Sequence, residues 1–344
     1  MNWGLIGNEW AVSGLSRHIA DQRVRHAYLF TGPDAVGKRT LAMRFARALN
    51  CEKAPRPGEI CDDTISEPCR VCRTVPLGAY PDLHVLTPEE SIRVDEIRQL
   101  QSRLALAPYE GRWRIALLTD FHQATISSAN AMLKTLEEPP SRVVLLLTCP
   151  EAESLLPTVA SRCEIVPLRQ VPSATIAQAL RERDVEPEKA ELLAAISGGR
   201  PGRAISLAED SATLRGREAA FQELSDLLEM DLPGRFAYVN RLLSKGELPE
   251  QRRRVEGVLD EWLSLWRDLL YQSYGADVAA RNPDRLPAMA RRANALTPAQ
   301  HRFIVNTIAE SLQAVEANAN LRLTLDTLLI DLPSWEGNGT GEGA

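Results

Sequence analysis

The sequence predicts an α/β domain with a parallel sheet covered by helices on both faces, followed by two all-helical domains. Short, almost continuously apolar runs alternate with helical patterns as far as residue 168, as expected for parallel strands buried on both faces. One run ends in a glycine-rich loop, "TGPDAVGKRT" (31–40), which is typical of phosphate-binding loops. Beyond Pro167 the strand patterns stop and apolar residues recur at helical spacing.

The elements of the first half follow from these patterns in chain order. The runs predicted to be strands are 27–32, 82–87, 112–120, 142–149 and 163–168. The helical patterns between them cover 39–50, 93–106 and 126–138, and Pro139 and Pro140 stop the last one. Residues 52–68 are rich in Pro, Glu and Asp and predict an insertion loop. Strands that alternate with helices in this way predict a doubly wound sheet.

The second half predicts helices only. Patterns at 173–183, 187–197 and 198–210 indicate a small helical unit, and a longer helical stretch covers about 213–331. We therefore expect domains at 1–168, 169–210 and 211–332, with a disordered tail at 333–344. Trp262 and Trp266 are four residues apart in one helical pattern, a spacing more typical of a core than of an interface.

Composition narrows the classes of function. The chain has 344 residues with 44% hydrophobic and 25% charged residues, which suits a globular protein of two or three domains. The net charge of −6 gives no general attraction to nucleic acid or to membranes. We find no basic, apolar leader at the start and no run of about 18 apolar residues. We therefore expect a cytoplasmic protein with no membrane partner.

The glycine-rich loop predicts a nucleotide site with one unusual residue. Gly32 and Gly37 allow backbone amides to surround a phosphate, and Lys38 would reach the terminal phosphates. The next residue is normally Ser or Thr, whose hydroxyl binds magnesium, but here it is Arg39. Thr40 comes one position late, on a different side of the helix.

The end of the third strand departs from the ATPase pattern as well. A magnesium-dependent ATPase normally ends this strand with Asp-Glu, whereas this chain has "LLTDFH". Thr119 stands where the metal-ordering Asp belongs and Asp120 where the water-activating Glu belongs, although a one-residue slip could make Asp120 a metal partner. Since phosphoryl transfer depends on such positioning, we expect weak or absent hydrolysis. Binding of ATP and magnesium without turnover stays open.

Four cysteines predict a metal site. Cys51, Cys61, Cys69 and Cys72 are separated by nine, seven and two residues. A Cys-x-x-Cys pair supplies half of a tetrahedral zinc site, and the insertion is long enough to fold back and complete it. The alternative is four free thiols in a loop.

Two longer stretches carry a family resemblance. "HAYLFTGPDAVGKRTLAMRFARALNCE" (26–52) resembles the start of bacterial DNA polymerase III clamp-loader proteins, which are AAA+ proteins. "SSANAMLKTLEEPPSRVVLLLTCPEAESLLPTVASRC" (127–163) is similar to a signature shared by their gamma/tau and delta-prime subunits. The resemblance covers 6–210 and, more loosely, residues up to about 332. It implies an AAA+ domain with a zinc insertion at 51–75, a helical lid and a helical collar.

Three positions favour one branch of this family. Arg39, Thr119 and Gly202 are all off the ATPase pattern, with Arg203 one residue beyond the position expected for a sensor arginine. The chain therefore resembles the delta-prime type, which would lack ATPase activity of its own within the DNA polymerase III holoenzyme. The alternatives are an active gamma/tau-type ATPase and a stand-alone AAA+ module that binds DNA through "QRRRVEG" (251–257).

The resemblance also implies roles for single residues. Arg162 would be an arginine finger that reaches the ATP site of a neighbouring subunit, and Thr148 would stand at the first sensor position. The residues of the chain's own degenerate nucleotide site would be Gly32, Gly37, Lys38, Arg39, Thr40, Asp120 and Thr148. Relatives end their zinc module with one more cysteine, where this chain has Val75. Either Cys61 replaces that ligand, which we favour, or the site is degraded. The implied partners are gamma/tau, delta, the sliding clamp and primer-template DNA, in a hetero-oligomer.

Overall fold

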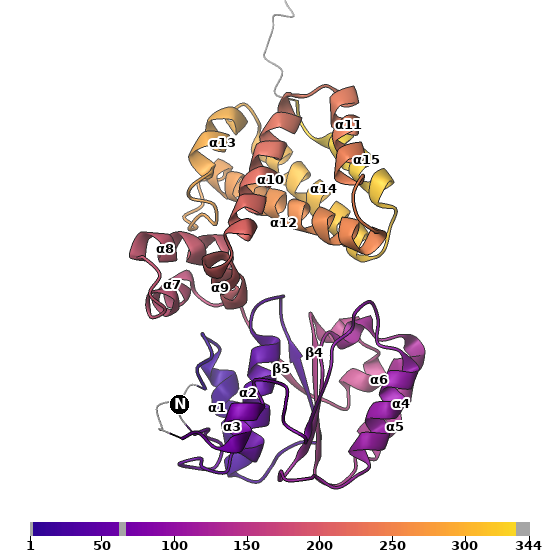
Figure 1. Ribbon diagram of the computed structural model, residues 1–344. Coiled ribbons are helices and arrows are strands. Elements are labelled where there is room, and N and C mark those ends of the chain that lie inside the picture. The colour runs from indigo at the N-terminus through magenta and orange to yellow at the C-terminus, as the bar shows by residue number, and fades with distance from the viewer. Residues whose placement is uncertain (1–2, 62–66, 335–344) are drawn as a thin grey trace, which may run out of the picture. The chain divides into compact units, whose positions relative to one another are not determined.

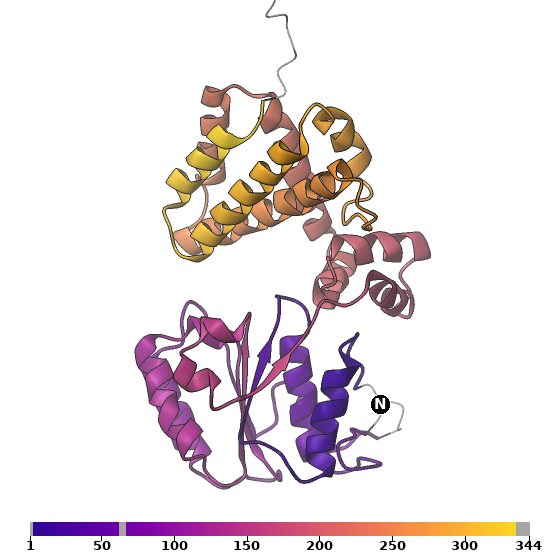
Figure 2. The same cartoon turned by 180° about the vertical axis from the view of Figure 1, so that it is seen from behind.

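The structure, a computed structural model, describes residues 3–61 and 67–334 (Figures 1 and 2). The chain divides into two compact units, the first made of 1–184 with 199–204 and the second of 185–198 with the residues from 205 onward. Most of the tail predicted at 333–344 lies outside the described residues. The predicted boundaries at 168 and 210 stay a prediction.

The first unit is built on a five-stranded parallel sheet in the order β2-β3-β4-β1-β5. Its strands are β1 (Ala27–Thr31), β2 (Leu83–Leu86), β3 (Arg114–Leu118), β4 (Val143–Cys149) and β5 (Glu164–Pro167). Every residue of β1, β3 and β4 is buried, which explains the continuous apolar runs that predicted them. The prediction of a parallel sheet is confirmed.

Helices cover both faces of the sheet, as Figure 1 shows. The helices of this unit are α1 (Glu9–Ala20), α2 (Lys38–Asn50), α3 (Arg70–Thr74), α4 (Val94–Leu104), α5 (Ile126–Glu137), α6 (Pro157–Ala160) and α7 (Ser173–Arg181), of which α7 does not lie on the sheet. Alternate residues of β1 face opposite layers: Tyr28 and Phe30 pack in one hydrophobic cluster with α1 and α2, while Leu29 packs in the other with α4 and α5. Short 3-10 turns follow β3 (Phe121–Gln123) and β4 (Ala152–Ser154).

The topology places a crevice at the carboxyl ends of β1 and β4. These strands are neighbours in the sheet, but the chain continues from β1 into α2 on one face and from β4 into α6 on the other face. Connections that leave neighbouring strands for opposite faces leave room for a ligand between them. The glycine-rich loop, which follows β1, lies at this point.

In the described part of the second unit all regular structure is helical. The helices are α8 (Pro187–Ile196), α10 (Ser211–Glu229), α11 (Leu232–Leu242), α12 (Leu248–Ser273), α13 (Leu286–Ala293), α14 (Pro298–Glu316) and α15 (Leu321–Asp331), while α9 (Pro201–Glu209) crosses between the units. The long α12 packs against α10, α13 and α14 and contributes Trp262 and Trp266, both fully buried. The expectation that these two tryptophans are core residues is confirmed.

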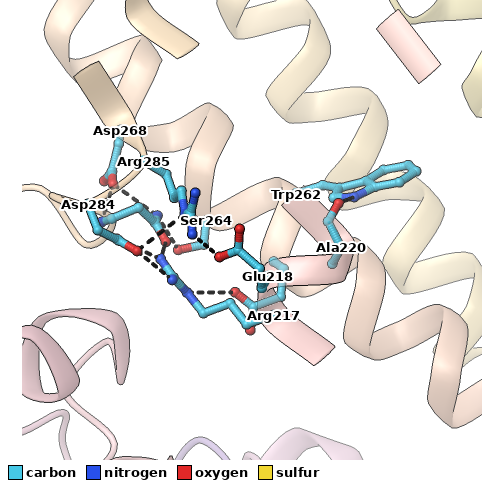
Figure 3. Close-up of polar contacts among 10 residues, drawn as sticks. Arg217, Glu218, Ala220, Trp262, Ser264, Asp268, Asp284 and Arg285 are labelled. Carbon is cyan, nitrogen blue, oxygen red and sulfur yellow. Dashed lines mark hydrogen bonds and ion pairs between the residues drawn. The ribbon is translucent and has the colours of Figure 1, made fainter. Parts of the chain in front are cut away.

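A buried polar network ties the segment before α13 to α10 and α12 (Figure 3). Arg217 of α10 donates to both carboxylate oxygens of Asp284 at 2.8 and 2.9 Å and to Asn282 Oδ1 at 2.9 Å. Asp268 of α12 accepts from the backbone N–H groups of Arg281, at 3.1 Å, and of Asn282, at 2.7 Å. Buried charges need such partners, so this network fixes a segment that has few apolar side chains of its own.

The basic run at 251–257 is used inside the fold. Arg252 of α12 donates to the Val315 carbonyl near the end of α14. Arg254 donates to the carbonyls of Leu242, at 2.9 Å, and Lys245, at 3.1 Å, just beyond α11. Cations at helix C-termini satisfy carbonyl groups that lack partners within the helix. These two guanidinium groups therefore act as helix caps, which weakens the hypothesis of a DNA-binding run.

Candidate functional site

Glycine is required in the loop between β1 and α2. Gly32 and Gly37 have φ of +137° and +112°, values that residues with a side chain rarely adopt. A Cβ on Gly32 would lie 2.5 Å from the carbonyl oxygen of Leu168, the residue after β5, so a side chain has no room at this position. The Gly32 N–H donates to the Pro150 carbonyl at 2.8 Å, which ties the loop to the end of β4.

The charge of Lys38 is already paired within the loop. Its ammonium group is buried and donates to Gly32 O at 2.6 Å, Pro33 O at 3.3 Å and Asp34 Oδ1 at 3.1 Å. Asp34 is an exposed residue of the loop itself, with 82% of its side chain accessible. The sequence analysis did not single out Asp34, although its position four residues before Lys38 in a phosphate-binding loop was a usable signal.

A cavity of about 310 Å³ lies beside this loop. It is lined by Asp34, Ala35, Gly37, Lys38, Arg39, Asp120, His122, Gln123 and Thr148. The structure thus brings together most of the predicted nucleotide residues from β4, the end of β3 and the loop. Thr40 is exposed and is not one of the lining residues, so its hydroxyl does not replace the one lost at Arg39.

The residues after β3 offer little to a metal ion. Thr119 is buried, and its hydroxyl donates to Thr87 Oγ1 at 3.0 Å. Asp120 adopts a left-handed conformation with φ of +48°, and its N–H donates to Thr148 Oγ1 at 2.9 Å. Asp120 and Asp34 are the two carboxylates among the described residues that line the cavity, and Asp34 is bound to Lys38.

His122 is a further residue of this cavity that the sequence analysis missed. In the described part of the chain its Nδ1 is buried without a hydrogen-bond partner. Burial lowers the pKa of His122, against the nearby charge of Asp120, which raises it. The lowered pKa favours the neutral imidazole, so His122 adds no positive charge beside the cavity.

Gly202 lies directly on the phosphate-binding loop. Its N–H donates to the Ala35 carbonyl at 2.8 Å, and a Cβ at this position would lie 2.9 Å from the same oxygen. The glycine therefore allows the start of α9 to approach the loop backbone closely. That Gly202 stands at the position of a sensor arginine stays a prediction.

Arg162 lies apart from this cavity, just beyond α6. Its guanidinium group donates to the Thr158 carbonyl at 3.0 Å and to Glu137 Oε1 at 2.7 Å. About 37% of its side chain is exposed. Arg162 is not one of the residues that line the loop cavity.

The four cysteines of the insertion converge. Their sulfur atoms lie within 4.8 Å of one another, and all four residues are buried. The separations are 3.8 Å for Cys51–Cys69, 3.6 Å for Cys61–Cys69 and 3.6 Å for Cys51–Cys72. Four thiolates about 2.3 Å from a tetrahedral zinc ion lie about 3.8 Å apart. The cluster therefore has the geometry to hold a metal ion, with Cys61 as one of the four ligands.

The surroundings of the cluster also suit a metal. The Cys61 N–H donates to the Cys51 sulfur at 3.2 Å, and the Cys69 N–H donates to the Cys61 sulfur at 3.4 Å. A hydrogen bond from the Cys72 thiol, the largest contribution, lowers the pKa of Cys51, and the same contact raises the pKa of Cys72. Val75 is fully buried in the hydrophobic cluster nearby and offers no ligand.

Comparison with known proteins finds similarity to subunits of DNA polymerase III. Residues 7–172 match the family described as DNA polymerase III, delta subunit. The delta' subunit of DNA polymerase III from Pseudomonas aeruginosa is 38% identical over 182 residues, which cover 51% of this chain and 53% of that protein. These matches support a clamp-loader subunit of the AAA+ type. The Escherichia coli DNA polymerase III subunit tau is 31% identical over 232 residues, 65% of this chain and 35% of tau.

The similarity covers only part of the length of the curated relatives. The chain spans between 35% and 53% of the length of these two curated relatives. Among solved structures, a DNA polymerase III gamma subunit-related protein from Thermotoga maritima is 20% identical and covers 93% of this chain and 97% of its own, with a TM-score of 0.43. In the described part of the chain, no helix is both long and apolar enough to cross a membrane.

Proposed function

We propose that this chain is a delta-prime-type clamp-loader subunit, which hydrolyses no ATP itself and supplies Arg162 to the ATP site of a neighbouring subunit. Its partners would be gamma/tau and delta subunits, the sliding clamp and primer-template DNA, in the cytoplasm. The relatives named tau and delta' support a subunit of a hetero-oligomeric DNA polymerase III complex. Our choice of the delta-prime type over the gamma/tau type depends on the chain's own nucleotide site.

The observation that carries the proposal is the state of Lys38. In a working phosphate-binding loop this lysine reaches the terminal phosphates, whereas here its ammonium group is bound by Asp34 and by two loop carbonyls. Arg39 removes the hydroxyl that would bind magnesium. A loop that is neutralised by its own carboxylate and has lost a metal ligand supports binding without turnover at most.

Arg162 is suited to act outside its own subunit. An arginine finger supplied in trans stabilises the charge that develops on the transferred phosphoryl group and raises the rate by about 10³–10⁵ in other nucleotidases. Arg162 is partly exposed, and its guanidinium donates to Thr158 O and Glu137 Oε1. A guanidinium group has five N–H donors, so donors remain for a phosphate of the adjacent subunit.

Reconstitution of the complex tests this proposal. The chain would be combined with gamma/tau, delta, the sliding clamp and primed DNA, and the ATP turnover of the assembly would be measured. We expect Arg162→Ala to lower turnover by at least about 100-fold while the assembly stays intact in gel filtration. Arg98→Ala, a matched control for an exposed arginine in an ion pair with Asp95, should change nothing. An unchanged rate with Arg162→Ala would rule out the finger.

The cysteine cluster would hold one zinc ion through Cys51, Cys61, Cys69 and Cys72. Zinc has no redox chemistry, and four protein ligands leave no open position, so the ion would stabilise the insertion rather than catalyse a reaction. The Trp3 indole N–H and the Ser16 hydroxyl both donate to the Gly58 carbonyl, at 3.1 and 2.8 Å. These bonds anchor the same insertion to the start of the chain and to α1.

A further inference from the structure

Glu137 and Arg162, which are 25 residues apart in the sequence, form an ion pair. Glu137 is the last residue of α5, and Arg162 follows α6, which packs against α5 on the same side of the sheet (Figure 1). The distance between Arg162 Nη2 and Glu137 Oε1 is 2.7 Å. The other guanidinium nitrogen, Nη1, donates to the Thr158 carbonyl at 3.0 Å. Two acceptors on different helices thus hold the two terminal nitrogens of one guanidinium group.

The position of Glu137 is unfavourable for the helix that carries it. The C-terminus of a helix has a partial negative charge, so a carboxylate there is destabilising. Glu137 and Glu138 both stand at the end of α5, where Pro139 and Pro140 prevent the helix from continuing. Glu137 is compensated by the guanidinium of Arg162.

The pair contributes little to the stability of the fold. About 51% of the Glu137 side chain and 37% of the Arg162 side chain are exposed, and ion pairs that are this exposed add little to the free energy of unfolding. The consequence of the contact is therefore geometric. It restricts a long, flexible side chain to one orientation while leaving part of it open to solvent.

We infer that Glu137 is the positioning residue for Arg162, an inference that rests on the proposed function of Arg162 as a finger in trans. Glu137 accepts from Nη2 and Thr158 from Nη1, so the guanidinium plane is fixed before a neighbouring subunit presents its nucleotide. Pre-organised donors need no rearrangement when charge develops in the transition state. The loss of Glu137 should therefore lower the rate of the chemical step without weakening ATP binding by the neighbour.

The test compares variants in the reconstituted complex, with kcat and KM for ATP measured separately. We expect Glu137→Ala to lower kcat by about three- to fivefold, the upper range for the loss of an exposed ion pair, with KM unchanged. Glu137→Gln keeps an oxygen acceptor for Nη2 and should recover part of the loss. Glu138→Gln, a matched control on the adjacent exposed glutamate, should leave both constants unchanged.

A double variant separates positioning from a general structural effect. In the Arg162→Ala background, Glu137→Ala should cause no further loss, because the residue it positions is absent. The inference is overturned by an unchanged or raised kcat in Glu137→Ala, by an equal loss in Glu138→Gln, or by a further loss in the double variant. If Arg162→Ala leaves ATP turnover unchanged, the proposed function has failed. If Arg162→Ala lowers turnover but Glu137→Ala does not, only the positioning role of Glu137 has failed.

Discussion

Asp34 should limit the affinity of the loop for nucleotide, and the substitution Asp34→Asn tests this. The carboxylate lies 3.1 Å from the Lys38 ammonium, and two unit charges at that distance in water attract by about 1.3 kcal/mol, from 332/(80 × 3.1). Because Asp34 is largely exposed, the pair delivers about 1 kcal/mol or less. The same carboxylate would repel a triphosphate, so its neutralisation should favour ATP by about 1 kcal/mol, roughly fivefold in Kd.

The assay is the binding of a fluorescent ATP analogue to the full chain, with and without magnesium. Asp95→Asn is the matched control, because Asp95 is an exposed aspartate paired with an arginine, Arg98, outside the cavity. We expect Asp34→Asn to bind the analogue about fivefold more tightly than the unmodified chain and Asp95→Asn to bind it equally. An equal or weaker affinity in Asp34→Asn, or no binding by either protein at millimolar analogue, would refute the reasoning.

Three other predictions concern stability and the metal. Arg235→Ala should destabilise the helical unit by about 3 kcal/mol or more in chemical denaturation. The reason is that the buried guanidinium group of Arg235 donates to the carbonyl groups of Leu227, Leu329, Leu332 and Pro333. The control Arg322→Ala, at an exposed arginine, should cost less than about 1 kcal/mol, and equal effects of the two variants would contradict this prediction. Purified chain should contain about one zinc ion, lost together with several degrees of Tm in Cys69→Ser/Cys72→Ser, and zinc retained by that variant would exclude the cluster. Burial raises the pKa of Asp82, but hydrogen bonds from three backbone N–H groups and from Arg114 outweigh burial and lower the pKa below its usual value. The contribution of Asp82 to the free energy of unfolding should therefore be complete above about pH 4 and be lost as the pH falls through the depressed pKa. The variant Asp82→Asn should lack this acid-dependent loss, measured as Tm against pH.

The central strands and the helices between them could be predicted because buried elements require apolar residues in continuous runs or at helical spacing. The run at 142–149 corresponds to β4, where every residue is buried, and Pro139 and Pro140 mark the end of α5. The helices α1, α3 and α6 were not predicted. The helix α3 holds five residues within the insertion, and its place depends on Cys69 and Cys72 meeting Cys51 and Cys61, which local patterns do not report.

The candidate sites were predicted in part. The loop glycines and the four cysteines could be predicted from their spacing. Few residues other than glycine adopt the positive φ that the loop requires, and few side chains other than cysteine supply the ligands of a structural zinc site. The state of Lys38 did not follow, because it depends on which side-chain conformation brings its ammonium group to Asp34. His122 and Glu137 were missed for a similar reason: each is defined by a contact or a cavity between segments that are separate in the sequence.

The central claim is that the chain's own loop performs no hydrolysis, and ATP turnover by the purified chain alone tests it most directly. The account predicts a rate with magnesium that equals the rate of a Lys38→Ala variant prepared in the same way. Brisk turnover that Lys38→Ala abolishes would contradict the account and would favour a gamma/tau-type ATPase.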